Sequence, residues 1–206
     1  MSGVPFAAWT IVVPLKVLPN AKSRLVASLS PAEHAELVRA IRADTLAAAR
    51  EVARVVVVAD VPSPDADLVQ RSPGLNGAIR DAAAHVARRW PRSGVVALVG
   101  DLPALRNVEL AAALDAAGEQ ARSYVPDAAG TGTTLLAAAP GVALAPAFGE
   151  GSAARHAAGA VRLDAGPGLR CDVDTAEDLD AAEALGLGAY TSAVLALRAS
   201  NIARSC

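Results

Sequence analysis

The feature that most constrains this chain is the alternation of short apolar runs with amphipathic helical stretches along its length. Strands are predicted at residues 9–15, 55–59, 94–99, 122–125 and 133–139, with an edge strand at 161–163. Helices are predicted at residues 31–52, 76–90, 108–117, 152–158 and about 174–185, with a weakly patterned helix after residue 186. This alternation predicts an α/β fold, a three-layer sandwich with a mostly parallel sheet between helices.

The length and composition favour one independently folding domain, residues 1–206. Two cysteines, Cys171 and Cys206, are too few for a disulfide framework and suit a reducing cytoplasm. No apolar run approaches the ~20 residues that span a bilayer, and the first residues lack a basic leader. The net charge of -2 argues against a nucleic-acid partner. A cytoplasmic location without membrane or nucleic-acid binding is expected.

The loop after the first predicted strand carries an unusual cluster of positive charge. Lys16, Lys22 and Arg24 lie there, and the first two are the only lysines among 19 basic residues. Lysine is a compact, mobile point charge, and a polyanion such as a nucleoside triphosphate suits such a loop. Neither GxxxxGK[ST] nor GxGxxG is present. A solvated basic loop is the alternative interpretation.

Two acidic segments suit a divalent cation. Asp101 follows the strand at 94–99, at the sheet edge where ligands of parallel α/β folds bind. Asp172 and Asp174 alternate along an extended stretch and so face one side. Mg²⁺ prefers such hard oxygen ligands together with substrate phosphates. The alternatives are a turn-forming Asp101 and a helix cap at Asp174 or Thr175.

Three further loops combine glycine with polar side chains: residues 130–134 (GTGTT), residues 148–156 (FGEGSAARH) and residues 72–78 (SPGLNGA). The first two offer hydroxyl and main-chain donors to an anion, and the third would frame a base at the start of a helix.

The three histidines give no clear sign of catalysis. His34 and His85 lack neighbouring residues in the pattern of a catalytic or metal site, and His156 follows a basic residue. HExxH, CxxC and GxSxG are absent, and nothing near Cys171 predicts a reactive thiolate.

Taken in order, these segments resemble the CofC family, the guanylyltransferases of deazaflavin coenzyme F-420 biosynthesis. The matching segments are PLK…AKSRL, GLNGA, GDLP, GTGTT, FGEGSAARH and DVDTAEDL, which cover almost the whole chain. The family is similar in fold to the molybdenum-cofactor nucleotidyltransferases, of nucleotide-diphospho-sugar transferase (MobA-like) type. PLKVLPNAKSRL replaces the glycine-rich LAGGxSxRxGxxK loop of that wider group, which points away from a molybdopterin substrate.

The resemblance implies transfer of GMP from GTP to a small phosphorylated three-carbon acid. Members of the family use 2-phospho-L-lactate, phosphoenolpyruvate or 3-phosphoglycerate. The alanine- and arginine-rich composition suggests a high-GC genome such as that of an actinobacterium, and on this ground phosphoenolpyruvate is the favoured acceptor. The acceptor phosphate is already ionised at neutral pH, so the reaction requires no general base.

Each matching segment then receives a role. The catalytic set is Lys16, Lys22, Arg24, Asp101 and Asp174. The nucleotide would contact Leu15, Lys16, Lys22, Gly74, Leu75, Asn76 and Gly100. The acceptor would contact Thr133 or Thr134, Gly149 and Ser152. Mg²⁺ would be held by Asp101 and Asp174, with Asp172 as a further ligand or a supporting residue.

Two other functions fit the same segments. One is the same reaction with another base or acceptor, for example cytidylyl transfer. The other is a non-catalytic GTP-binding sensor, which the pair of carboxylates disfavours because binding alone does not need them. The product is expected to be labile, so the downstream transferase that consumes it is a plausible partner.

Overall fold

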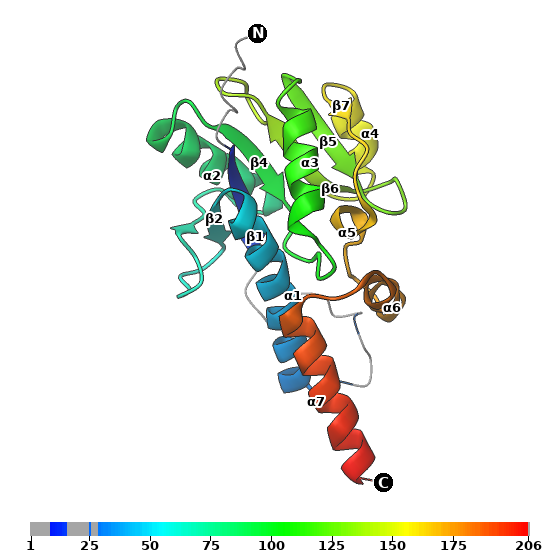
Figure 1. The fold of residues 1–206 in the computed structure, drawn as a ribbon. Helices are drawn as coiled ribbons and strands as arrows, with labels where there is room; N and C mark the ends of the chain where they lie inside the picture. The colour runs from blue at the N-terminus through cyan, green and yellow to red at the C-terminus, as the bar shows by residue number, and fades with distance from the viewer. Residues whose placement is uncertain (1–8, 16–24, 26–28, 206) are drawn as a thin grey trace.

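The computed structural model describes residues 9–15, 25 and 29–205, the last five of these by their backbone alone. It contains one seven-stranded sheet in the order β3-β2-β1-β4-β6-β5-β7 (Figure 1). The strands are β1 (Trp9–Leu15), β2 (Arg54–Ala59), β3 (Leu68–Val69), β4 (Gly94–Leu98), β5 (Arg122–Pro126), β6 (Thr133–Ala138) and β7 (Val161–Arg162). Neighbouring strands are parallel except at β6, which is antiparallel to both β4 and β5.

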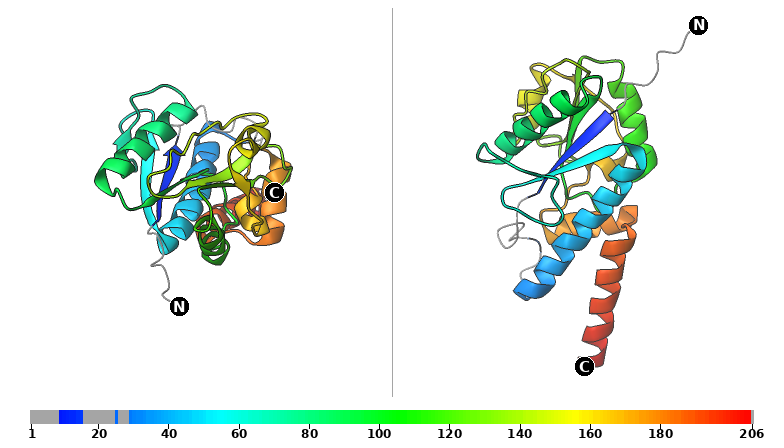
Figure 2. Two further views of the ribbon diagram at one scale, coloured as in Figure 1. Left: turned by 90° about the horizontal axis from the view of Figure 1, so that it is seen from above. Right: turned by 90° about the vertical axis from the view of Figure 1, so that its left-hand side faces the viewer.

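Helices cover both faces of the sheet, as the alternation of elements predicts (Figure 2). On one face, α1 (Pro31–Val52) and α3 (Asn107–Ala117) pack on side chains such as Ile11. On the other face, α2 (Leu75–Arg89) and α4 (Ser152–Ala157) pack on side chains such as Val12. Successive strand residues point to opposite faces, so β1 contributes to both apolar layers. The predicted three-layer sandwich is therefore confirmed.

A third apolar cluster lies beyond the carboxyl edge of the sheet. The 22-residue α1 is about 33 Å long, and its first half extends past the sheet beside α6 (Ala176–Leu185) and α7 (Ala189–Ser205) (Figure 1). The buried Asp44 carboxylate of α1 accepts hydrogen bonds from the backbone N–H groups of Tyr190, at 3.0 Å, and Thr191, at 2.8 Å. These bonds anchor the start of α7 to α1.

Most predicted element boundaries lie within one residue of the observed ones. The Ser30–Glu33 capping box at the start of α1 is confirmed. β3 and the four-residue α5 (Pro167–Arg170) were not predicted, because both are too short to show a period. α6 begins at Ala176, later than predicted. No helix in the described part of the chain combines the length and apolar character that crossing a membrane requires.

Candidate functional site

The reversed direction of β6 brings the loop that precedes β6 to the same edge of the sheet as the loops that follow the other strands. β1, β2, β4 and β5 share a direction, so the residues that follow them, including Asp60, Asp101 and Asp127, lie at one edge. Because β6 runs the opposite way, its first residue, Thr133, lies at this same edge. Acidic and hydroxyl side chains from separate segments thus meet at the carboxyl edge.

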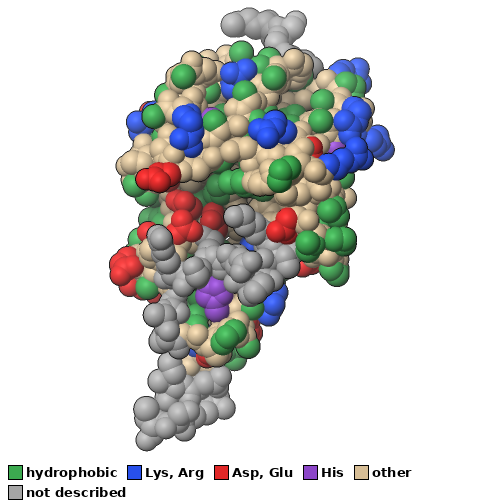
Figure 3. Space-filling view, turned by 180° about the vertical axis from the view of Figure 1, so that it is seen from behind, with side chains coloured by type: hydrophobic (Ala, Val, Ile, Leu, Met, Phe, Trp, Pro, Cys, Tyr) green, Lys and Arg blue, Asp and Glu red, His purple; other side chains and the backbone are tan. Residues whose placement is uncertain are grey.

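The two predicted acidic segments lie side by side there. The backbone N–H of Val173 donates to the carbonyl oxygen of Asp101 at 3.1 Å. Burial raises the pKa of Asp172 to about 7, and the negative charges of Asp101, Asp127 and Asp174 add to this effect. The space-filling view shows acidic side chains gathered across the middle of one face (Figure 3). Several carboxylates therefore repel one another at this edge.

The cap at the start of α6 belongs to Thr175 and not to Asp174. The Thr175 hydroxyl accepts from the backbone N–H of Asp178, and the Asp178 carboxylate accepts from the N–H groups of Thr175 and Asp174. The Asp174 side chain is therefore not the helix cap.

The Cys171 thiol lies beside the same acidic segment. Burial, together with the charges of Asp172 and Asp178, raises the pKa of this thiol, which agrees with the expectation that it is not a reactive thiolate.

The donor chemistry of the acidic group fits a divalent cation that also binds substrate. Within residues 9–15, 25 and 29–205, no three His, Cys, Asp or Glu side chains form a metal-holding set by themselves. Mg²⁺ usually takes only one or two carboxylates and completes its shell with water and phosphate oxygens. Asp101 and Asp172 supply such a pair, whose mutual repulsion a bound cation would relieve.

A second polar group joins the start of β6 to α4. The Ser152 hydroxyl lies 3.2 Å from the hydroxyl oxygen of Thr133, and Nδ1 of His156 lies 2.9 Å from the same oxygen. All three side chains are buried. The hydroxyl of Thr134, the other predicted candidate, instead lies 3.5 Å from the carbonyl oxygen of Val125. Thr133 is thus the threonine that the fold brings to Ser152.

The loop before α4 is held from both sides. The Asn76 side-chain amide of α2 donates to the Phe148 carbonyl oxygen at 3.0 Å and accepts from the Phe148 N–H at 2.8 Å. Arg155 donates to the carbonyl oxygen of Ala147. Gly149 has a φ of 125°, a conformation that favours glycine. These contacts connect the segment predicted to bind the nucleotide with the segment predicted to bind the acceptor.

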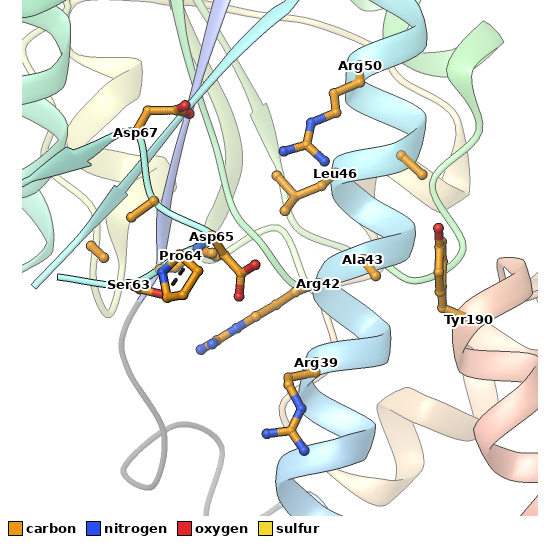
Figure 4. A pocket seen from close by; sticks show the side chains of 14 residues that line it. Arg39, Arg42, Ala43, Leu46, Arg50, Ser63, Pro64, Asp65, Asp67 and Tyr190 are labelled. Atoms are coloured by element: carbon orange, nitrogen blue, oxygen red, sulfur yellow. Dashed lines mark hydrogen bonds between the residues drawn. The ribbon is translucent and has the colours of Figure 1, made fainter. Parts of the chain in front are cut away.

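A cavity of about 510 Å³ lies between the end of β1, one face of α1 and the loop after β2 (Figure 4). Leu15 lines it, and so do Arg39, Arg42 and Arg50 of α1. Arg42 extends from the helix toward the loop that carries Asp65. Burial lowers the pKa of Arg42, against the opposing effect of the nearby Asp101 and Asp60 carboxylates.

Sequence reasoning did not single out these arginines. Their spacing of three and eight residues places them on one helical face, and this spacing was the sequence signal from which they could have been found.

Among the predicted nucleotide contacts, Gly74 has a φ of 77° and precedes α2, whose first residue is the exposed Leu75. A Cβ on Gly100 would lie 2.9 Å from the Leu15 side chain, so glycine permits their close approach. Lys16, Lys22 and Arg24 lie outside the described residues.

Comparison with known proteins identifies a family. The sequence model of CofC-like guanylyl transferases matches residues 9–197. A phosphoenolpyruvate guanylyltransferase of Streptomyces avermitilis is 50% identical, with 91% of this chain and 94% of that protein covered. One from Salinispora arenicola is 47% identical, with 96% and 98% covered.

Solved structures support the fold. A putative nucleotide-diphospho-sugar transferase from Desulfovibrio desulfuricans has a TM-score of 0.72 at 17% identity, covering 95% of this chain and 96% of its own. The protein Rv0371c from Mycobacterium tuberculosis, solved in complex with manganese, has a TM-score of 0.52 at 20% identity, with 85% and 97% covered. These proteins share the architecture predicted for this chain.

Proposed function

The chain belongs to the CofC-like guanylyltransferases, and on that premise we propose that it transfers GMP from GTP to phosphoenolpyruvate. The products are enolpyruvyl-diphosphoguanosine and pyrophosphate, formed on the route to coenzyme F-420. The observation that carries the proposal is that the Asp101–Asp172 pair and the Thr133–Ser152 pair lie at the same edge of the sheet. The names of the relatives that are about half identical to the chain support phosphoenolpyruvate as the acceptor.

The reaction needs alignment and charge neutralisation, not proton removal. An ionised phosphate oxygen of the acceptor attacks the α-phosphorus of GTP, and the bond to the β-phosphate oxygen breaks with its electron pair leaving on pyrophosphate. His156 has no free basic nitrogen to assist, because Nε2 accepts from the Ala147 N–H and Nδ1 contacts Thr133. This arrangement suits a reaction without a general base.

Asp101, Asp172 and Asp174 are the residues that would hold a divalent cation, and we infer Mg²⁺. When bound, Mg²⁺ would supply positive charge against the acceptor phosphate and the α-phosphate. The manganese complex of the mycobacterial relative in fold agrees with use of a divalent ion by proteins of this architecture. Main-chain pairing of Val173 with Asp101 keeps the two acidic segments in register for this role.

The nucleotide would lie toward β1 and the acceptor toward β6. Arg42 adds positive charge beside Leu15 and Asp101, where a triphosphate would extend, and complements the contribution expected of Lys16, Lys22 and Arg24. Gly74, Leu75 and Asn76 would border the guanine or its ribose. Thr133 and the main chain at Gly149 would bind the acceptor's carboxylate and phosphate. Ser152, predicted as an acceptor contact, would support them, because its hydroxyl donates to Thr133 and its N–H donates to the Gly149 carbonyl oxygen.

The test is pyrophosphate release from GTP and Mg²⁺ with phosphoenolpyruvate, 2-phospho-L-lactate or 3-phosphoglycerate, with the product identified by mass. The expected result is a guanylylated product with phosphoenolpyruvate in preference to the other two acids. CTP in place of GTP serves as the base control. Binding of GTP with no pyrophosphate released in the presence of any of the acids would indicate a sensor and contradict the proposal.

A further inference from the structure

His156 holds one residue of the acceptor side in a defined hydrogen-bonding state. Its side chain is 4% exposed. Nε2 accepts from the backbone N–H of Ala147 at 3.0 Å, and Nδ1 lies 2.9 Å from the Thr133 hydroxyl oxygen. The Phe148 ring packs edge-on against the imidazole, with 5.0 Å between ring centroids. The ring is thus fixed at both nitrogens and along one side.

The contact to Ala147 determines the tautomer. A backbone N–H can only donate, so Nε2 must present its lone pair and carry no hydrogen. Burial, with a smaller effect of Arg155, lowers the pKa of His156 to about 4, so the ring is neutral at pH 7. The single ring hydrogen therefore lies on Nδ1 and is donated to the hydroxyl oxygen of Thr133.

The Thr133 hydroxyl is consequently left as a donor. Its oxygen has two lone pairs; one accepts from His156 Nδ1–H and the other from the Ser152 hydroxyl at 3.2 Å. No acceptor for Thr133's own hydrogen is found among the residues that the structure describes. That hydrogen therefore remains for a ligand at the carboxyl edge, where β6 begins.

We propose that His156 is a positioning residue that directs the Thr133 hydroxyl hydrogen toward an anionic oxygen of the acceptor, a carboxylate or a phosphate. This inference rests on the proposed function and deepens it. In the other tautomer, Nδ1 would accept from Thr133, and a hydroxyl lone pair would face the anion and repel it. The Ala147 N–H, through His156, thus sets the polarity of a contact on the acceptor side.

Two amide variants separate this role from simple support of the loop. In His156→Asn, the side-chain NH₂ lies near the position of Nδ1 and still donates to Thr133, while the bond to Ala147 is lost. In His156→Gln, the amide oxygen reaches the position of Nε2 and still accepts from Ala147, while the donor to Thr133 is lost. The loop-support role predicts that Gln is the milder change, and the positioning role predicts that Asn is.

The measurement is steady-state pyrophosphate release at varied phosphoenolpyruvate and varied GTP. We expect His156→Gln to raise the KM for phosphoenolpyruvate at least ~10-fold, corresponding to a loss of about 1.4 kcal/mol, with the KM for GTP changed less than ~2-fold. The KM of His156→Asn for phosphoenolpyruvate should be at least ~5-fold lower than that of His156→Gln. His85→Gln, on α2, is the matched control and should leave both values unchanged.

Thr133 gives a second readout that does not require the histidine variants to fold well. Thr133→Val should raise the acceptor KM as much as His156→Gln, and the double variant should show little further loss because both act through one hydrogen bond. Additive losses, a milder effect of Gln than of Asn, or an unchanged acceptor KM in Thr133→Val would each overturn the proposal. A wild-type enzyme that releases no pyrophosphate would instead contradict the proposed function.

Discussion

Replacing Asp101 by asparagine tests the charge arrangement on which the proposed mechanism depends. The substitution keeps the size of the side chain and removes one negative charge beside Asp172 and Arg42. Loss of one well-placed electrostatic group costs about 3–4 kcal/mol of transition-state stabilisation in other enzymes. At about 1.4 kcal/mol per factor of ten, kcat should fall at least ~100-fold.

Stability should change little, because two effects oppose each other. Arg42 loses a favourable charge, whereas Asp172 loses a repelling one. We expect a net change below about 1 kcal/mol, which shifts the melting temperature by less than ~4 °C in a domain of this size. Asp115→Asn, exposed on α3, is the control for charge alone. The assay is pyrophosphate release at saturating GTP, and retention of a tenth or more of wild-type turnover would refute the role of Asp101.

Three further predictions concern stability. Asp44→Ala should lower the free energy of unfolding in urea by about 3 kcal/mol, because buried N–H groups at the start of α7 lose their acceptor, whereas Asp115→Ala on the surface should not. Because His156 has a pKa of about 4 when folded and about 6.5 when unfolded, the unfolded chain binds more protons between these values, and the contribution of His156 to stability should fall by about 2 kcal/mol from pH 7 to pH 5. The raised pKa of Asp172, about 7, changes stability in the opposite direction over this range, so the measured quantity is the free energy of unfolding of the wild type minus that of His156→Asn, which should fall by about 2 kcal/mol. Gly77→Ala should lower the melting temperature, since the added Cβ would lie 2.6 Å from the Ser72 carbonyl oxygen.

The elements of the fold could be predicted because local signals mark them. β1 is an apolar run interrupted only by Thr10, and the capping box at Ser30 fixes the start of α1. The start of α6 was placed too early, since Asp174 and Glu177 present a spacing similar to that of the true box formed by Thr175 and Asp178. Sequence spacing alone does not distinguish two overlapping caps.

The site was predictable in its segments but not in its contacts. Loop position in an α/β sheet indicated Asp101 as an edge residue. Thr133 was predicted instead from the glycine and hydroxyl residues of the loop that precedes its strand. The pairing of Asn76 with the Phe148 main chain joins residues 72 positions apart, and no local pattern encodes such a contact. The role of His156 likewise depends on which main-chain N–H faces Nε2, which only the folded loop determines.

The reversal of β6 explains why the loop that precedes this strand can contribute to the same site as the loops that follow the other strands. In a purely parallel sheet, the loop that precedes a strand lies at the edge opposite the loop that follows it. Here β5 and β6 form an antiparallel pair, so the turn between Pro126 and Thr133 stays at the carboxyl edge. The same turn carries Asp127, whose charge acts on Asp172, and ends at the hydroxyl that His156 orients. One antiparallel strand thus places the proposed metal-binding carboxylates and the proposed acceptor-binding hydroxyl at the same edge of the sheet.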